Sequence, residues 1–590
     1  MAESRAAISS SKEIDGISEG TKPVSLFSRK SKVPFESAAD RARRKHEFRV
    51  RALLCAISGV MLGMSFPPFP FGILACFGLV PWLIVLADID EMGRALRYSY
   101  LTFLIFHIIT LNWTGGYAHM NDPYMMIAGA VTMFVHPVFY FLPAAGYVLA
   151  RKYLGDWTAL IALPFLWVGY EYSHTLGEWS FPWITIGNSQ SNNLAGIQFI
   201  SVTGILGVSF WIVVINALAF VLYSQLAHGR WQPRSRSSVL MAAGIVALYF
   251  LPKIHGGIVL SQACSSLPEK TITVGIVQAN VDPWEKWKRS GHSTIDLHLD
   301  MTQQLVNDAR KPRPDLVLWP ETAIPYYVLT KENGSTLRYI LERINTLGVP
   351  VLSGLPNAVY YDDTTKAPPS AKRILGTGER YDAFNSAALF QPGVDEIPWY
   401  GKMKMVPIAE RVPYADAFYF FDFLRWGVGI GGWQIGRDSV VFTEKKTGAR
   451  FNALICYESV YPEFVASFVR SGAEFLTLIT VDSWWDRMSG AYQHQRFSIF
   501  RAIENRRWLA RCAVGGISCY IDPYGHVYDA TELFTQATLS RTIGRSTELT
   551  FYSEHGDWLG SGCLFIAGLF VAAALGQKFI RRKREEAWSS

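Results

Sequence analysis

Long apolar segments near both ends of the chain constrain its fold more than any other feature of the sequence. They recur before about Leu251, and one more follows Trp558, whereas the residues between have the composition of an ordinary globular domain. An apolar run of about twenty residues is long enough to cross a bilayer as a helix. Half of the 590 residues are hydrophobic and the mean hydropathy is positive. We therefore expect a membrane protein that carries one water-soluble domain.

We predict seven membrane spans before the soluble domain and one after it. The seven cover residues 52–66, 71–87, 101–113, 125–150, 160–172, 197–222 and 240–251, and the eighth covers residues 558–577. The loops after spans two, four and six contain Lys or Arg, whereas the loops at 67–70, 115–123 and 173–194 contain neither. Because basic loops stay in the cytoplasm, this asymmetry predicts cytoplasmic termini and a soluble domain on the outer side of the membrane.

Composition divides the chain into five predicted parts. They are a disordered cytoplasmic tail (1–48), a seven-helix membrane domain (49–254), an extracytoplasmic domain (270–552), an eighth helix (557–578) and a basic cytoplasmic tail (579–590). The formal net charge of +7 lies mainly in the tails and in short loops. That distribution indicates membrane orientation rather than nucleic-acid binding.

In the soluble domain, short apolar runs alternate with helical patterns. We expect strands at 272–278, 316–319, 351–355, 387–391, 451–455, 475–480 and 509–514, and helices at 295–309, 337–346, 461–469 and 493–506. Strands that recur with helices are typical of a layered α/β sheet domain.

Three chemically active side chains fall at the ends of apolar strands. Glu321 ends LVLWPE, Lys402 lies in WYGKMKMVPIAE, and Cys456 ends FNALIC. Corresponding strand ends share one edge of an α/β sheet, so we expect the three to meet. A carboxylate can accept the proton of a thiol, and a lysine with nearby N–H groups can stabilise an oxyanion. Taken singly, each has a commoner explanation, because free cysteines are usually inert and buried while lone charges usually lie on the surface.

The seven cysteines occur singly, with no CxxC pair and no Cys/His cluster. Neither a zinc site nor a disulfide framework is therefore expected. Cys512 and Cys519 flank a Gly-Gly pair, and we expect them in strands that belong to the core. Cys456 alone lies at a strand end with polar residues next to it.

The segments around the three residues carry a family resemblance. WPETAIP, YGKMKMVPIAERVPY and ALICYES resemble the catalytic signatures of the nitrilase superfamily, whose members place a Glu–Lys–Cys triad on an α-β-β-α sandwich. With the predicted spans, the chain resembles the apolipoprotein N-acyltransferases over about residues 50–577, and FPWITIGNSQ, VQANVDPWEKW and LITVDSWWD support this resemblance. The implied fold class is α/β, a nitrilase-like α-β-β-α sandwich inserted between transmembrane helices.

The resemblance implies roles for the matching residues. Cys456 would take an acyl chain from a membrane phospholipid as a thioester and pass it to the α-amino group of an apolipoprotein's N-terminal diacylglyceryl-cysteine. Glu321 would be the general base, and Lys402 would stabilise the oxyanion. The implied substrate-binding residues are Trp287, Glu410, Tyr457, Glu458 and Trp484.

The resemblance also implies a setting. No metal or soluble cofactor is expected, because the donor ester already carries the energy. The expected enzyme is a monomer in the bacterial inner membrane, with its catalytic domain on the periplasmic side.

Several of these assignments have an alternative. Trp284 is as available an aromatic as Trp287, Glu458 can instead be structural, and Trp484 fits either a site wall or a core.

The chain also departs from the family pattern. The family's Phe-Gly-Glu, Asn-Asp and Asn-Asn-Gly are replaced here by Ile408, Ala409 and Glu410, by Val481 and Asp482, and by Val514, Gly515 and Gly516. These changes concern substrate detail more than the type of reaction.

Two other functions compete with acyl transfer. The first is a membrane-tethered amidase that hydrolyses a small amide with the same triad, although eight spans exceed what a tether requires. The second is a non-catalytic membrane scaffold or transporter, against which the intact Glu321, Lys402 and Cys456 argue. An ion-coupled carrier would also be expected to carry several intramembrane charges, whereas the predicted spans hold a single charged residue, Glu171.

Residues 414–426 hold eight aromatic or large apolar side chains shortly after Glu410. The segment is interpreted as a buried core helix or, in our hypothesis, as a lid that dips into lipid, because a thiol that attacks a phospholipid must be reached from the bilayer.

Deletion of residues 418–426 in a chain that still folds is expected to impair acylation of Cys456, because the lid hypothesis gives this segment the task of admitting lipid. Acylation is measured as a mass increase of the protein after incubation with phospholipid. Unchanged acylation would contradict the lid hypothesis.

Overall fold

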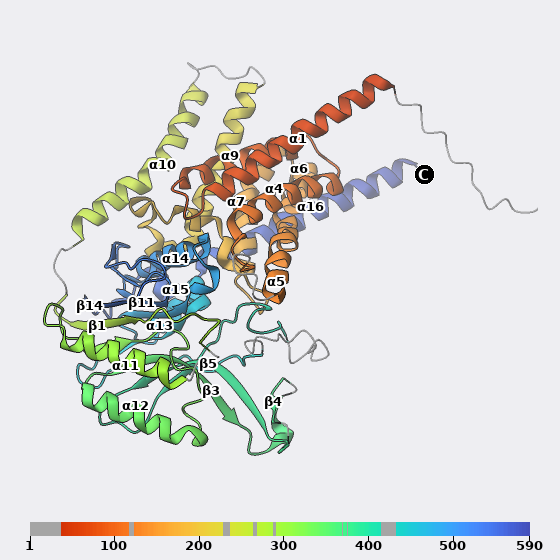
Figure 1. Ribbon diagram of the computed structural model, residues 1–590. Helices are drawn as coiled ribbons and strands as arrows, with labels where there is room; N and C mark the ends of the chain where they lie inside the picture. The colour runs from red at the N-terminus through yellow and green to blue at the C-terminus, as the bar shows by residue number, and fades with distance from the viewer. Residues whose placement is uncertain are drawn as a thin grey trace, which may run out of the picture. The chain divides into compact units, whose positions relative to one another are not determined.

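The computed structural model describes residues 37–116, 123–227, 236–263, 268–286, 291–368, 370–374, 376–414 and 432–589. The chain forms two units, Met1–Val50 and Arg51–Ser590. All of the soluble domain and nearly all of the apolar helices belong to the second unit. In Figure 1 the apolar helices before the soluble domain run from red to yellow-green, the soluble domain from green to blue, and the apolar helix after it is blue.

Helices occupy every segment predicted to span the membrane. They are α1 (Ala38–Met64), α2 (Ala75–Gly78), α3 (Val80–Ala87), α4 (Met92–Leu111), α5 (Pro123–Phe134), α6 (Phe141–Leu154), α7 (Asp156–Ser173), α8 (Ile200–Thr203), α9 (Ile205–Ala227), α10 (Arg236–Gln262) and α16 (Trp558–Ser589). Among the described residues, four helical stretches are long and apolar enough to cross a membrane: Met125–Leu154, Ile205–Ala227, Ser238–Gln262 and Trp558–Trp588. Apolar helices thus flank the soluble domain on both sides, and the count of seven spans plus one stays a prediction.

The soluble domain contains two principal sheets. The seven-stranded sheet has the order β14 (Ala537–Gly544), β1 (Thr271–Gln278), β2 (Leu316–Leu318), β3 (Val351–Tyr360), β5 (Arg380–Phe390) and β4 (Lys372–Arg373), with β6 (Trp399–Gly401) paired to β5. The five-stranded sheet has the order β13 (Val527–Tyr528), β12 (Cys519–Ile521), β11 (Leu509–Val514), β10 (Leu476–Val481) and β9 (Leu454–Ile455). Strands β1, β2 and β3 are parallel, as are β9, β10 and β11.

Alternate residues along the first sheet face two different cores. Val274 and Leu318 pack between the two sheets, whereas Val277 and Val317 pack on the opposite face, as the two-residue period of a strand requires. The Tyr520 hydroxyl on β12 donates a 2.6 Å hydrogen bond to the Val274 carbonyl and so joins the sheets. The helices outside the sheets are α11 (Gly291–Asn307) and α12 (Gly334–Leu347) on the first, and α13 (Pro462–Arg470) and α14 (Ser489–Asn505) on the second (Figure 1). The predicted α-β-β-α sandwich is therefore confirmed.

One side chain of α14 joins the sandwich to the apolar helices. The amide oxygen of Gln493 accepts hydrogen bonds from the indole N–H groups of Trp183 at 2.7 Å and Trp113 at 3.1 Å. Its amide nitrogen donates to the backbone carbonyls of Pro67 at 2.9 Å and Thr110 at 3.0 Å. Because one buried amide satisfies partners from three membrane-side segments, it fixes the soluble domain against them.

The strand expected at 451–455 is wrong in detail. It is divided into β8 (Arg450–Phe451), which pairs with β7 (Phe442–Thr443), and β9, which pairs with β10. Between them, the backbone N–H of Thr477 bonds the Asn452 side chain at 3.1 Å and the Thr477 hydroxyl bonds the Asn452 carbonyl. These side-chain bonds replace ladder bonds at that point. Strand β14 was not predicted, because Arg541 interrupts the alternation of apolar and polar residues in its sequence.

Candidate active site

Cys456 occupies the turn between β9 and a short 3₁₀ helix, η9 (Cys456–Val460). Its φ of 53° lies in the left-handed region, where residues other than glycine are strained. The first helical turn, η9, starts at Cys456 itself, whereas the sequence pattern predicted a helix only from residue 461. A sharp strand-to-helix turn of this kind lifts a nucleophile out of the sheet edge.

Glu321 follows β2 and is held by two donors. The Asn385 amide on β5 donates to one carboxylate oxygen at 2.7 Å, and the backbone N–H of Val481 donates to the other at 3.1 Å. The turn that carries Glu321 packs on Gly354 of β3, where an added Cβ would lie 2.6 Å from the Glu321 Cα. Donors on both oxygens favour the ionised carboxylate of Glu321. Gly354 has no side chain and so allows the turn that carries Glu321 to pack closely on β3.

Lys402 is fully buried beside two carboxylates. Its Nζ lies 2.7 Å from Glu410 Oε1 and 3.9 Å from Glu321 Oε1. The second oxygen of Glu410 accepts from the Val406 N–H at 2.8 Å, and the Lys402 backbone N–H donates to the Asn385 carbonyl at 2.8 Å. The lysine is thus fixed by its main chain and by its side chain.

These groups shift one another's ionisation. Burial raises the pKa of the Cys456 thiol above its ordinary value, and the charge of Glu321 adds to that shift while Lys402 opposes it. Burial also raises the pKa of Glu321, against the opposing charge of Lys402. Burial alone would lower the pKa of Lys402, but Glu410, Cys456 and Glu321 outweigh it and raise the pKa above its usual value. At rest the site therefore holds a neutral thiol and a fixed ammonium group, beside a carboxylate able to take a proton.

Glu458 is buried behind the site and does not line the cavity at Cys456. One carboxylate oxygen accepts from the Tyr400 hydroxyl at 2.6 Å and the Met403 N–H at 2.7 Å, and the other accepts from the Ile455 N–H at 2.8 Å. The side chain is fully buried, and burial raises the pKa of its carboxyl to about 7. Of the two interpretations given for Glu458, this geometry supports the structural one: it ties the Lys402 segment to the turn of Cys456.

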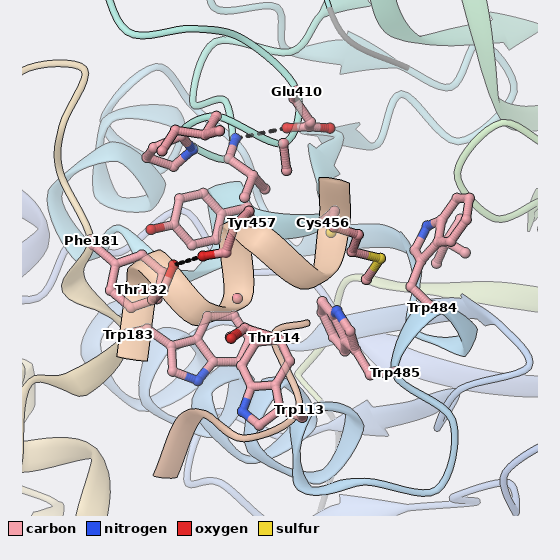
Figure 2. A pocket seen from close by; sticks show the side chains of 18 of the residues that line it. Trp113, Thr114, Thr132, Phe181, Trp183, Glu410, Cys456, Tyr457, Trp484 and Trp485 are labelled. Carbon is pink, nitrogen blue, oxygen red and sulfur yellow. Dashed lines mark hydrogen bonds between the residues drawn. The ribbon is translucent and has the colours of Figure 1, made fainter. Parts of the chain in front are cut away.

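A cavity of about 710 Å³ opens at Cys456. Its polar end is formed by the soluble domain, with Glu321, Asn385 and Glu410, and the rest of its wall is mostly apolar. Helix α5 and the residues that follow it contribute Met125, Ala128, Gly129, Val131, Thr132, Val135, His136 and Phe139 to that wall. Figure 2 shows Trp113, Trp183 and Trp485 grouped on one side of Cys456 and Glu410 on the opposite side.

The predicted substrate-binding residues divide into three groups. Glu410, Tyr457 and Trp484 line the cavity, Glu458 does not, and Trp287 lies outside the described residues. Trp284, the alternative to Trp287, lines the cavity and packs edge-on against Trp484 at 4.9 Å between ring centroids. Of the aromatic segment interpreted as a lid, the structure describes only Tyr414, so that hypothesis also lies outside the described residues.

Two polar residues next to Glu321, Asn385 and Lys286, were not predicted from the sequence. Asn385 bridges Glu321 and Glu410, at 2.7 and 3.4 Å from its amide nitrogen, and its sequence signal was a polar residue inside an apolar strand. Lys286 is buried, with its Nζ 2.5 Å from the Thr322 hydroxyl and 3.4 Å from the Glu321 carbonyl. Burial lowers the pKa of Lys286 to about 7, against the opposing charge of Glu321. Within the described ranges, no group of His, Cys, Asp or Glu side chains is arranged to hold a metal ion.

Departures from the family pattern leave the triad's contacts intact. Val481 supports Glu321 through its backbone N–H, which does not depend on the side chain. Gly515 has a φ of 59°, and a Cβ on Gly516 would collide with the Asp482 carboxylate. The glycine pair therefore gives room to a buried acid behind the site.

Glu321, Lys402 and Cys456 at one edge of an α-β-β-α sandwich define a carbon–nitrogen hydrolase domain with a cysteine site. The family described as carbon-nitrogen hydrolase matches residues 273–548, and the apolipoprotein N-acyltransferase N-terminal domain matches residues 58–218. Among solved structures, a Saccharomyces cerevisiae member of branch 10 of the nitrilase superfamily is similar over 48% of this chain and 93% of its own, with 14% identity and a TM-score of 0.34.

Full-length relatives narrow the class to one family. The chain is 33% identical over 536 residues to the apolipoprotein N-acyltransferase of Chlorobaculum tepidum, which covers 88% of this chain and 96% of that relative. It is 30% identical over 538 residues to the Geobacter metallireducens protein of the same name, with 90% and 95% covered. The chain belongs to the apolipoprotein N-acyltransferase family.

Glu458→Gln tests whether Glu458 positions the site or touches substrate. A glutamine amide would face at least one backbone N–H, so we expect a loss of about 1–3 kcal/mol in stability and a lower kcat with unchanged KM for the donor. Thermal unfolding and steady-state kinetics in detergent measure the two effects. Glu444→Gln is the matched control, because Glu444 is also buried and accepts from the backbone of its own turn. A raised KM with unchanged stability would show a substrate contact instead.

Proposed function

We propose that this protein transfers an acyl chain from a membrane phospholipid to the α-amino group of an N-terminal diacylglyceryl-cysteine on apolipoproteins. The acyl chain passes through a thioester on Cys456. Glu321 acts as general base and general acid, Lys402 stabilises the oxyanion, and Glu410 holds Lys402 in place.

The observation that carries this proposal is the shared cavity. Cys456 and Glu321 line the same space as helix α5, which belongs to the apolar stretch Met125–Leu154. A small polar amide would need no membrane helix in its binding site, whereas an acyl chain gains about 0.8 kcal/mol for each CH₂ group that it buries. The cavity therefore fits a lipid whose ester reaches the thiol from the apolar side.

The first half-reaction forms the thioester. Cys456 gives its proton to Glu321 and attacks the ester carbonyl, and the oxyanion that forms lies near the Lys402 ammonium group and the N–H of Tyr457. Because the proton moves from the thiol to a carboxylate, the net charge of the buried site does not change. Collapse breaks the bond to the glycerol oxygen, which takes the proton from Glu321 and leaves as a lysophospholipid.

The second half-reaction forms the amide. The neutral α-amine attacks the thioester carbonyl and gives a proton to Glu321, and the same donors stabilise the second oxyanion. Collapse then expels the Cys456 thiolate, which recovers a proton from Glu321. The enzyme returns to its starting state with no external co-reactant.

The proposed setting follows from the sequence. Basic residues in alternate loops support cytoplasmic termini and a periplasmic catalytic domain in a bacterial inner membrane. The enzyme is proposed to act as a monomer.

Transfer activity is tested with purified protein, phosphatidylethanolamine with a labelled acyl chain, and a synthetic diacylglyceryl-cysteine peptide. We expect labelled N-acyl peptide that resists hydroxylamine, because an amide forms, and a loss of at least about 10³-fold in Cys456→Ala, as expected for removal of a nucleophile.

Cys519→Ala is the matched control, because Cys519 is buried in strand β12 away from the cavity. Hydrolysis of small amides without any transfer to the peptide would support the amidase alternative and overturn the proposal.

A further inference from the structure

A buried polar network lies directly behind Cys456. His494 on α14 places its Nδ1 2.9 Å from one Asp482 oxygen, and the other Asp482 oxygen accepts from the Arg511 guanidinium at 2.8 Å. The Nε2 of His494 lies 2.9 Å from the Ser459 hydroxyl and 3.2 Å from the Cys456 carbonyl oxygen. All four side chains of this network are buried, and neither His494 nor Ser459 is among the described residues that line the cavity.

The network resembles the Ser–His–Asp arrangement of a hydrolase, but its serine has another partner. The Ser459 hydroxyl donates to the Cys456 carbonyl at 2.9 Å. Since that hydroxyl has only one hydrogen, its oxygen must accept from His494, and Nε2 must carry a proton. The Ser459 hydroxyl and the His494 Nε2–H therefore both face the Cys456 carbonyl oxygen as hydrogen-bond donors. Ser459 is consequently not free to act as a nucleophile.

A fixed carbonyl also fixes the amide on the other side of the same peptide. The peptide between Cys456 and Tyr457 is planar and trans, so its C=O and its N–H point in opposite directions. The carbonyl oxygen points to the buried network, and Cys456 and Tyr457 themselves line the cavity. The Tyr457 N–H has no partner within η9, because it belongs to the first turn. It thus points away from the buried network, on the side of the peptide that faces the cavity.

We propose that His494 and Ser459 are positioning residues for acyl transfer, and that they act through the Cys456–Tyr457 peptide. By holding the Cys456 carbonyl, they aim the Tyr457 N–H at the oxyanion. Hydrogen bonds to the carbonyl also polarise the peptide and strengthen its N–H as a donor. Asp482 and Arg511 hold the imidazole in the orientation that this task requires.

The electrostatics of Asp482 fit this arrangement. Burial alone would raise its pKa, but Arg511 and His494 outweigh burial and lower the pKa to about 2. Asp482 is therefore a fixed negative charge beside His494 Nδ1. The Arg511 guanidinium lies 3.1 Å from the same nitrogen and can only donate to it. Burial lowers the pKa of His494, so the ring is neutral and its single proton is on Nε2, which faces the Cys456 turn. The inference rests on the proposed acyl transfer, since only a reaction with an oxyanion needs the Tyr457 amide.

Two reactions of Cys456 separate this role from a general structural one. Acylation by phosphatidylethanolamine in detergent micelles passes through an oxyanion, whereas alkylation by iodoacetamide displaces iodide at a saturated carbon and forms none. Both are followed by intact mass on the full chain in single-turnover time courses. The variants are His494→Leu, His494→Gln and Ser459→Ala, with Cys456→Ala as the background.

Ser467→Ala is the matched control. The Ser467 hydroxyl also donates to a carbonyl three residues earlier, that of Phe464, but it does so in α13, away from the nucleophile. It removes the same kind of hydrogen bond as Ser459→Ala.

We expect His494→Leu and Ser459→Ala to slow acylation by about tenfold or more. Removal of an oxyanion donor lowers kcat by about 10²–10³-fold, and a donor that is present but poorly oriented should lower it less. Alkylation and the phospholipid concentration at half-maximal rate should not change. His494→Gln should recover part of the rate, because its amide can donate to the carbonyl.

Equal losses of acylation and alkylation, or no loss of either, would overturn the inference. If His494→Leu does not fold, the acylation and alkylation rates of Ser459→Ala alone test the inference. Failure of the unsubstituted protein to become acylated would instead overturn the proposed function, and this inference with it.

Discussion

The buried ion pair between Lys402 and Glu410 is the interaction on which the rest of the site depends. An ammonium group taken fully out of water costs several kcal/mol unless a partner compensates it, and removal of that partner costs roughly 3–5 kcal/mol. Glu410 is that partner at 2.7 Å, and Asn385 connects it to Glu321. The end of β2, the middle of β5, the segment after β6 and the loop with Glu410 must therefore come together before the site is stable. A fixed positive charge next to a thiol is the consequence, and acyl transfer needs that charge in its transition state.

The apolar helices complete the site. The sandwich supplies charged and nucleophilic groups, and α5 with the tryptophans supplies the apolar wall of the same cavity. Gln493 fixes the two parts to each other through Trp113 and Trp183, and its neighbour His494 reaches the Cys456 turn. Helix α14 thus contacts both the membrane side and the nucleophile. The proposed lipid donor fits this arrangement, because helix α5 and the residues that follow it line the cavity at Cys456.

Much of this was predictable from the sequence, and the exceptions have physical causes. Apolar runs predicted the helices, and the positions of Glu321 and Cys456 at strand ends predicted that these residues meet. The expected single sheet edge is wrong, because Glu321 follows β2 of the seven-stranded sheet and Cys456 follows β9 of the five-stranded sheet. Asn385 was missed because a polar residue in an apolar strand reveals its partners only in three dimensions. Glu458, expected to contact substrate, does not line the cavity. Its carboxylate accepts hydrogen bonds from the Tyr400–Met403 segment and from Ile455 instead. Ser459 and His494 have no local signal, since their role depends on a contact across 35 residues.

The central claim is that Cys456 carries the acyl chain as a thioester, and intact-mass analysis of the purified protein after incubation with phospholipid tests it most directly. Cys456→Ala is analysed in parallel. The account predicts a mass increase of one acyl chain that hydroxylamine removes and that the variant lacks. An unmodified mass with every phospholipid offered, in a protein shown to be folded, would contradict it.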